Sequence, residues 1–212
     1  MIVKVCGMRD VQNIRDVEAL GIDMMGFIFW PRSSRYVGQS DLGYRPCCQR
    51  VGVFVDEAIS QVCRIAADFA LDYIQLHGSE SPQYLSDLRT ACSASGCATA
   101  APRLVKAFNI SVADDLAQTA DYSGLADLFL FDTKGKSVGG NGEKFDWSVL
   151  SSYDGDTPFL LSGGIGPHDA SLINAFHHPR CIGIDLNSRF ETAPGLKDVD
   201  ALRKFLEELN RK

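Results

Sequence analysis

Two residues able to transfer protons each close a short apolar run of the sequence. Cys6 ends IVKVC, and Asp132 ends LFLFD. A thiol and a carboxylic acid that face one substrate can remove one proton from it and deliver another. Each also has a structural alternative, because a cysteine in an apolar run is often a small buried side chain and an aspartate after a strand often forms a turn. We predict that the two residues form an acid and base pair.

Glycine and polar residues after two later runs indicate a phosphate site. Gly163 and Gly164 lie in LLSGGIG, and Asn187 and Ser188 lie in IDLNSR. Glycine lets the backbone approach an anion closely, and the N-terminus of a short helix favours negative charge. Two tight turns are the alternative. We predict that these four residues, together with Asp185, bind the substrate.

Further polar residues follow other apolar runs. Arg35 lies in WPRSSRYV, where a guanidinium could make a forked contact with a substrate carboxylate, although a solvated surface arginine is the alternative. For Asp56 and His77 we favour helix capping or hydrogen bonding to other residues of the site. The glycine-rich residues 134–142 follow Asp132 and fit either a connector or a lid.

The apolar runs recur along the whole chain and predict its strands. Eight runs start at residues 2, 24, 50, 73, 103, 127, 158 and 181. Each run is nearly continuous in apolar residues rather than alternating, which is typical of parallel strands buried on both faces.

Helical patterns fill the gaps between these runs. Asp10 is suited to cap a helix that Gly21 ends, and residues 199–209 carry an apolar stripe. Strand and helix alternating eight times predict a single (β/α)8 TIM barrel over residues 1–212, with a doubly wound open sheet as the alternative. Residues 90–102 fit a loop or an irregular helix end. In such a barrel the candidate residues would all share one rim, where the strands end.

Composition limits the partners and the compartment. The net charge of −6 argues against a nucleic-acid or anionic-membrane partner, so a local site must hold any anionic substrate. No apolar stretch approaches about 18 residues and no signal-peptide pattern opens the chain, so we expect a cytoplasmic protein. Seven cysteines are an odd number, which argues against a complete disulfide framework, and no cysteine and histidine cluster predicts a metal site.

Seven motifs, in order along nearly the whole chain, resemble one enzyme family. They are KVCGM, GFIFWPRSSRYV, RVGVFVD, IQLHGSE, FDTKGKSVGGNGEKFDW, LLSGGI, and GIDLNSRFE with PGLKD. The chain resembles the phosphoribosylanthranilate isomerases of tryptophan biosynthesis. This resemblance implies an Amadori rearrangement that opens the ribose of N-(5-phosphoribosyl)anthranilate and gives 1-(2-carboxyphenylamino)-1-deoxyribulose 5-phosphate. It also implies that the reaction needs no cofactor.

The resemblance assigns a role to each matching residue. Asp132 would be the general acid that protonates the furanose ring oxygen and opens the ring to a Schiff base. Cys6, as a thiolate, would be the general base that removes the C2 proton. Arg35 matches the family's contact to the anthranilate carboxylate. Gly163, Gly164 and the loop after the eighth run match the family's phosphate site.

That last loop departs from the family, in which VSSGVE is common. Asn187 replaces a serine and Arg189 a glycine, so the backbone and the phosphate donors can differ there. Two other functions stay open: a related sugar-phosphate barrel such as indole-glycerol-phosphate synthase, and a non-catalytic phosphate-binding barrel. The first expects a lysine and glutamate set, whereas Cys6 ends the first run, and the second needs no acid and base pair. We expect a small phosphoribosyl partner, no nucleic acid or membrane, and a monomer or a homodimer.

Overall fold

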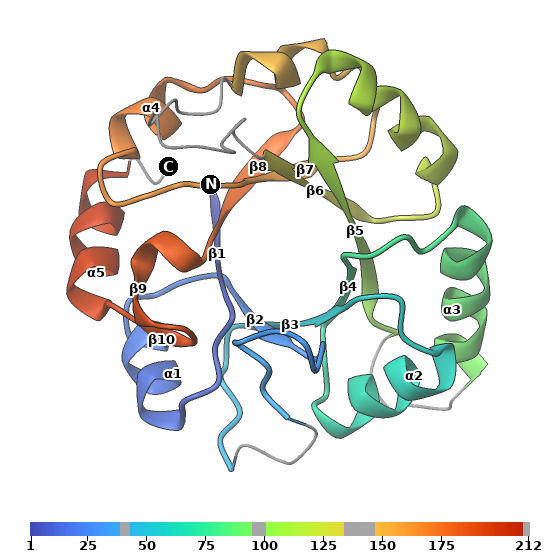
Figure 1. The fold of residues 1–212 in the computed structure, drawn as a ribbon, viewed down its shortest axis with the longest axis horizontal. Coiled ribbons are helices and arrows are strands. Elements are labelled where there is room, and N and C mark those ends of the chain that lie inside the picture. The colour runs from blue at the N-terminus through green and yellow to red at the C-terminus, as the bar shows by residue number, and fades with distance from the viewer. Residues whose placement is uncertain (39–42, 95–100, 134–146, 210–212) are drawn as a thin grey trace.

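Eight parallel strands close into a barrel in the computed structural model, which describes residues 1–38, 43–94, 101–133 and 147–209. The strands lie in chain order around the barrel, and β1 also pairs with β8 (Figure 1). They are β1 (Ile2–Cys6), β2 (Met24–Ile28), β3 (Gln49–Phe54), β4 (Tyr73–Leu76), β5 (Arg103–Ile110), β6 (Leu128–Thr133), β7 (Phe159–Ser162) and β8 (Cys181–Leu186). The predicted barrel is confirmed. The first residue of each predicted run lies within one position of the first residue of the corresponding strand.

Both faces of the strands are buried, which explains the continuous apolar runs. Successive side chains of a strand point to opposite faces. Along β6, Leu128 and Leu130 belong to a cluster inside the barrel, while Phe129 and Phe131 belong to the larger core outside it. The inner cluster consists of Met24, Val51, Tyr73, Val105, Ala107, Leu128, Leu130 and Leu160.

Helices surround the barrel, although the connections differ in helix type (Figure 1). The α-helices are α1 (Val11–Glu18), α2 (Ile59–Asp68), α3 (Pro82–Ala94), α4 (Ala170–Ala175) and α5 (Val199–Glu208). Two connections carry the 3₁₀ helices η1 (Ala113–Tyr122) and η2 (Trp147–Ser152) instead. The part of the β2–β3 connection that is described forms turns, bends and an isolated bridge. In the described ranges no helix is long and apolar enough to cross a membrane.

The predicted boundaries of the first helix agree with the structure, because capping residues mark both of its ends. Oδ1 of Asp10 accepts a hydrogen bond from the backbone N of Asn13 at 2.8 Å, which begins α1. Gly21, with a φ of +71°, follows the end of that helix. The irregular segment predicted over residues 90–102 starts as the last turn of α3, and residues 95–100 lie outside the described residues.

A short hairpin beside the end of β8 was not predicted. After the 3₁₀ helix η3 (Ser188–Phe190), β9 (Glu191–Ala193) and β10 (Leu196–Lys197) pair antiparallel. The side chain of Asn13 in α1 holds this hairpin. Its Nδ2 donates to the carbonyl oxygen of Lys197 at 2.9 Å, and its Oδ1 accepts from the Lys197 N at 2.8 Å. The hairpin thereby places two charged side chains next to the strand ends.

Candidate active site

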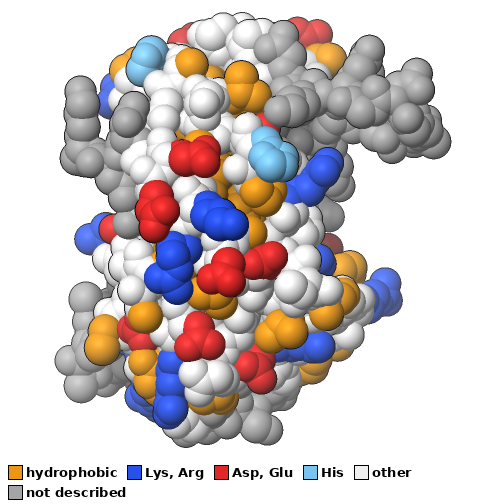
Figure 2. Space-filling model, turned by 90° about the vertical axis from the view of Figure 1, so that its left-hand side faces the viewer, with side chains coloured by type: hydrophobic (Ala, Val, Ile, Leu, Met, Phe, Trp, Pro, Cys, Tyr) orange, Lys and Arg blue, Asp and Glu red, His pale blue; other side chains and the backbone are white. Residues whose placement is uncertain are grey.

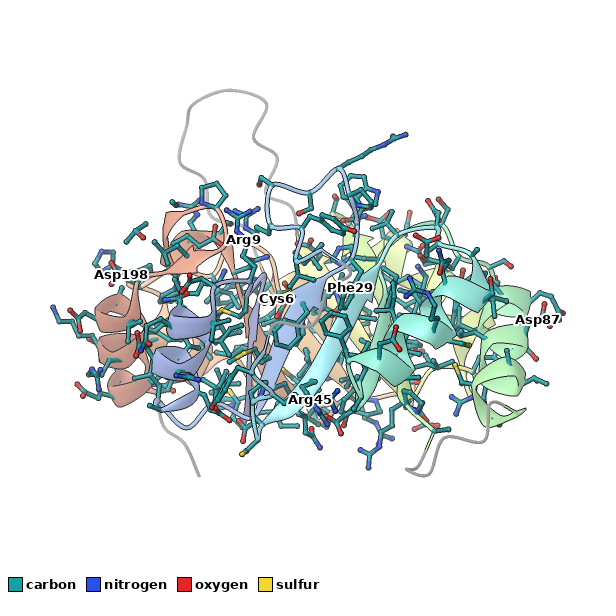
Figure 3. All side chains as sticks on the ribbon, turned by 90° about the horizontal axis from the view of Figure 1, so that it is seen from below. Cys6, Arg9, Phe29, Arg45, Asp87 and Asp198 are labelled. Atoms are coloured by element: carbon teal, nitrogen blue, oxygen red, sulfur yellow. The ribbon has the colours of Figure 1, made fainter. Side chains whose placement is uncertain are left out.

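The C-terminal ends of the strands surround one cavity. In Figure 3, Cys6 lies within the barrel below the rim that carries Arg9, whereas Arg45 lies at the opposite rim. The cavity measures about 160 Å³. Its lining includes the predicted residues Cys6, Asp132, Gly163, Gly164, Asp185, Asn187 and Ser188. It also includes Ile28, Val53, Gln75, His77, Ser162, Ile165 and Arg189. Of the predicted site residues, only Arg35 lies outside this lining.

Cys6 is buried against a buried ion pair. Nζ of Lys4, on the same strand, lies 2.9 Å from Oδ1 of Asp185, and its charge acts on the Cys6 side chain. Burial raises the pKa of the Cys6 thiol, and Lys4 opposes that rise because its charge favours the thiolate. Burial disfavours the charge on Lys4, but Asp185 and Cys6 outweigh burial and raise its pKa. The sulfur therefore lies beside a stable cation.

A second buried cation acts on Cys6 from the hairpin. Nζ of Lys197 donates to Oε1 of Glu191 at 2.6 Å and to Oδ1 of Asn187 at 2.8 Å. Burial lowers the pKa of Lys197, and Glu191 partly restores it. The positive charge of Lys197 also lowers the pKa of Cys6. The charges of two lysines, each of which has a carboxylate partner, thus favour the Cys6 thiolate.

Arg35 is fixed at the rim by the same carboxylate. Nε of Arg35 lies 2.8 Å from Oε1 and 3.0 Å from Oε2 of Glu191, and Nη2 lies 2.6 Å from Oε2. Burial raises the pKa of Glu191, but the hydrogen bonds from Arg35 and Lys197 lower it below its usual range. Glu191 occupies the edge formed by Nε and Nη2, and within the described part of the chain no acceptor takes the edge formed by Nη1 and Nη2.

The close approach of Arg35 to β1 requires a glycine. A Cβ added to Gly7 would lie 2.7 Å from Cδ of Arg35 and 2.8 Å from Oδ1 of Asn187. Gly7 also has a φ of +80°, a backbone conformation that residues other than glycine rarely adopt. The residue directly after Cys6 therefore allows the arginine to pack over the end of the strand.

Asp132, at the end of β6, faces a histidine whose proton position is set by a glutamine. Nε2 of His77 lies 3.6 Å from Oδ2 of Asp132, and Nδ1 of His77 lies 2.9 Å from Nε2 of Gln75. An amide nitrogen only donates, so Nδ1 accepts and Nε2 carries the proton that points to Asp132. Oε1 of Gln75 has no partner among the described residues. If the Gln75 amide were turned over, its two N–H donors would lie unpaired in the place of Oε1. That would cost more free energy than one unpaired oxygen, so the orientation with Nε2 toward His77, and with it this tautomer, is favoured.

The two predicted phosphate loops meet at the same cavity. Gly163 and Gly164 have φ values of +94° and +68°, in the left-handed region that favours glycine. A Cβ added to Gly164 would meet nothing within 4 Å, so the backbone there is open. After the neighbouring strand β8, η3 begins directly after Asn187, whose side chain is oriented by Lys197.

Comparison with known proteins places this geometry in a family. A sequence profile described as N-(5'phosphoribosyl)anthranilate (PRA) isomerase matches residues 3–208. The chain belongs to the phosphoribosylanthranilate isomerase family. It is 47% identical over 218 residues to the N-(5'-phosphoribosyl)anthranilate isomerase of Parabacteroides distasonis, which covers 99% of this chain and 93% of the relative.

Solved structures of phosphoribosylanthranilate isomerases share the fold. The one from Thermotoga maritima superposes with a TM-score of 0.81 at 30% identity, over 98% of each chain. Another, in complex with reduced 1-(o-carboxyphenylamino)-1-deoxyribulose 5-phosphate, gives a TM-score of 0.79 at 28% identity, again over 98% of each chain. The predicted family and enzyme class, an isomerase of tryptophan biosynthesis, are confirmed.

Several side chains at the site of this isomerase were not predicted from the sequence. Lys4, Glu191 and Lys197 lie inside motifs that carry the family resemblance, yet no role was assigned to them. Lys4 did leave a signal, because a lysine within the apolar run IVKVC needs a buried partner. His77 was expected to cap a helix or to hydrogen-bond other site residues, and it lines the cavity beside Asp132.

Two other expectations have different outcomes. Asp56, expected to cap a helix or to hydrogen-bond other residues of the site, has a φ of +48°, and its Oδ1 accepts a hydrogen bond from the Ser79 N at 2.6 Å. The proposed lid over residues 134–142 lies outside the described residues.

A larger hollow lies away from the strand-end site. It measures about 650 Å³ and lies where α4 covers β7 and β8. Its lining is mainly apolar, with His177 and His178 among its polar groups, and it contains neither Cys6 nor Asp132. The chemistry points to the smaller cavity, where charged groups converge.

Proposed function

We propose that this chain converts N-(5-phosphoribosyl)anthranilate to 1-(2-carboxyphenylamino)-1-deoxyribulose 5-phosphate, with Cys6 as the general base and Asp132 as the general acid. The observation that carries the proposal is that a thiol beside two lysines and a carboxylate beside a histidine line one cavity. Membership of the isomerase family supports the choice of substrate. A solved relative in complex with a reduced form of the product supports it further.

The reaction begins at Asp132. Its carboxylic acid donates a proton to the furanose ring oxygen, the bond between C1 and that oxygen breaks, and the nitrogen lone pair forms a Schiff base with C1. The carboxylate that results faces the Nε2–H of His77, which Gln75 orients. A positioned acid of this kind contributes about 10²- to 10⁴-fold to a rate.

Cys6 carries the second half of the reaction. Its thiolate removes the proton from C2, and the electrons of that bond form the enolamine as the Schiff base nitrogen becomes neutral. Tautomerisation then adds a proton at C1 and gives the ketone at C2. Lys4 and Lys197 stabilise the thiolate between turnovers. No step uses a cofactor or a metal ion.

The remaining predicted residues bind the two ends of the substrate. Arg35 offers the edge that Glu191 leaves open to the anthranilate carboxylate, and a guanidinium can bind both oxygens. Gly163, Gly164 and the loop of Asn187 and Ser188 bind the phosphate, mainly through backbone N–H groups.

Asp185 on β8 is the last of the predicted substrate-binding residues, and it lies opposite Lys4, two residues before Cys6 on β1. Its Oδ1 is held by Lys4 at 2.9 Å, and its Oδ2 lies 3.3 Å from Oγ of Ser162. Because Asp185 lines the cavity with its position fixed, it can accept a hydrogen bond from a ribose hydroxyl. We assign it to substrate binding.

The experiment that tests the function is turnover of the fluorescent anthranilate substrate by the purified chain. We expect the fluorescence to fall as product forms, without added cofactor. Indole-glycerol formation from the product would instead indicate the related synthase, and phosphate binding without turnover would indicate a non-catalytic barrel. A cytoplasmic location belongs to the same proposal, and so does the lack of a nucleic-acid partner, which the net charge of −6 supports.

A further inference from the structure

Two cysteines on neighbouring outer helices face each other at short range. Cys63 lies in α2 and Cys92 in α3, and Figure 1 shows these helices side by side on the outside of the barrel. The two Sγ atoms are 3.0 Å apart. A disulfide bond is about 2.05 Å long, so the sulfurs need to move by only about 1 Å to bond.

The surroundings of this pair favour sulfur chemistry over metal binding. Within the described ranges no group of three or more histidine, cysteine, aspartate or glutamate side chains could hold a metal ion. Cys63 is partly exposed, whereas Cys92 is buried, so a small reagent reaches Cys63 first. Burial, together with the neighbouring Cys63, raises the pKa of Cys92 to about 12. Cys92 therefore stays a thiol until a reaction partner is already beside it.

We propose that Cys63 and Cys92 are a modification site that forms a reversible intramolecular disulfide by exchange with a small disulfide such as oxidised glutathione. The Cys63 thiolate attacks one sulfur of that disulfide and releases the first glutathione thiolate. Cys92 then loses its proton to solvent, attacks Sγ of Cys63 and releases the second glutathione thiolate. Two protein thiols are oxidised, and one glutathione disulfide is reduced to two glutathione molecules.

The cross-link would change stability rather than catalysis. It joins α2 to α3 and closes the chain between residues 63 and 92, which restricts the unfolded state. The cavity at the strand ends contains neither cysteine. This proposal is independent of the proposed function, because its readouts are thiol content, cross-link position and melting temperature.

The test is oxidation of the reduced full-length chain with excess oxidised glutathione under native conditions, followed by an acid quench. We expect the thiols of Cys63 and Cys92 to be lost together, with no glutathione retained on either residue, whatever the exposed Cys47 takes up. Peptide mapping should join Cys63 to Cys92. The melting temperature should rise by about 5 °C or more and should return to its starting value on reduction.

Single variants identify the partners. Cys63→Ser and Cys92→Ser should each abolish the cross-link, and Cys92→Ser should retain glutathione on Cys63. Cys97 lies outside the described residues, so Cys97→Ser is the control that should cross-link like the unaltered chain. A cross-link that maps to Cys97 or to the adjacent Cys47 and Cys48 would overturn the proposal. So would a stable mixed disulfide on Cys63 in the unaltered chain, or a mapped cross-link that lowers the melting temperature.

Discussion

Cys6 is the residue whose surroundings are most unusual for its type. A buried thiol resists ionisation, and the two lysines that lie near it reduce this cost without cancelling it, since the pKa of Cys6 stays raised. The lysines are themselves buried, and each depends on a carboxylate: Lys4 on Asp185 and Lys197 on Glu191. The ionisation of one sulfur thus depends on two ion pairs whose members come from distant parts of the chain.

The first prediction concerns the pH dependence of kcat/KM. If the Cys6 thiolate is the base, activity rises as pH rises through its pKa, and because burial raises that pKa, the rise should extend above about 8.5, the ordinary thiol value. Lys4→Met removes a charge that favours the thiolate and should move the rise to higher pH. Asp185→Asn removes a charge that disfavours the thiolate and should move it to lower pH.

The opposite signs of these two shifts are the check on the assignment. General damage to the site would lower activity in both variants without moving the pH profile in opposite directions. Circular dichroism should accompany the rates, because Lys4→Met leaves Asp185 buried without its partner and can cost about 3–5 kcal/mol of stability. A pH profile that is the same in both variants would remove Cys6 as the titrating base.

The second prediction concerns Arg35 and the carboxylate that holds it. Arg35→Ala should weaken product inhibition by about 2 kcal/mol, or roughly 30-fold, because the substrate carboxylate loses a charged partner. Glu191→Gln should weaken it by a smaller factor, since the guanidinium remains but is less firmly held. Glu191 acts on binding through Arg35, so the double variant should be no weaker than Arg35→Ala alone.

A matched control lies on the same rim. Arg9 donates a hydrogen bond from Nη1 to the Ser34 carbonyl at 3.1 Å and does not line the cavity (Figure 3). Arg9→Ala should leave the product inhibition constant unchanged. Losses that simply add in the Arg35 and Glu191 double variant would show that Glu191 acts on binding by another route, either through Lys197 and Asn187 or by contact with the substrate itself.

At the scale of elements, the loops after β7 and β8 depend on backbone conformation more than on side chains. Gly164 can adopt its φ of +68° without strain, and an added Cβ there would project into open space. That open space is where the phosphate would approach the backbone N–H groups. A side chain at this position would therefore cost conformational strain and would also obstruct the anion.

The third prediction separates these two effects with a matched glycine. Gly124 has a φ of +74° and open surroundings like those of Gly164, but it lies in the connection before β6. Gly164→Ala and Gly124→Ala should lower the melting temperature by similar amounts. Only Gly164→Ala should raise KM, with Gly164→Val raising it further. Equal KM values in the two alanine variants would place the phosphate elsewhere.

The elements themselves could be predicted because their signals are local. Each strand is a run of apolar residues that shows in four to eight consecutive positions, and Asp10 marks a helix start by its own chemistry. The hairpin of β9 and β10 gives no such signal, since it is short and is held by Asn13 from the other end of the chain. Its two charged residues were missed for that reason.

At the scale of the whole molecule, closure of the barrel explains which site residues the sequence could supply. Parallel strands bring every strand end to one rim, so reading the strand ends predicted Cys6, Asp132, Asp185 and the phosphate loops. The positions of the strand ends do not predict which side chains pair with one another. Lys4 and Asp185 are 181 positions apart, and Arg35 and Glu191 are 156 apart, so only the folded chain shows that they meet.

The distribution of charge fits a local site on an acidic protein. On the face shown in Figure 2, acidic and basic side chains are interspersed and do not form a patch of one sign. Around the cavity the cations outnumber the carboxylates by one charge, since Lys4, Arg35, Arg189 and Lys197 face Asp132, Asp185 and Glu191. This local excess can attract an anionic substrate despite the net charge of −6.

The measurement that tests the central claim most directly is kcat for Cys6→Ala and Asp132→Asn with the anthranilate sugar phosphate. Each should lower kcat by about 10²- to 10⁴-fold with an unchanged fold, the usual contribution of one proton-transfer group. Cys181→Ala and Asp87→Asn serve as controls, because neither residue lines the cavity and both variants should keep full activity. If soluble, folded Cys6→Ala or Asp132→Asn turns over like the unaltered chain, the acid and base assignment is wrong.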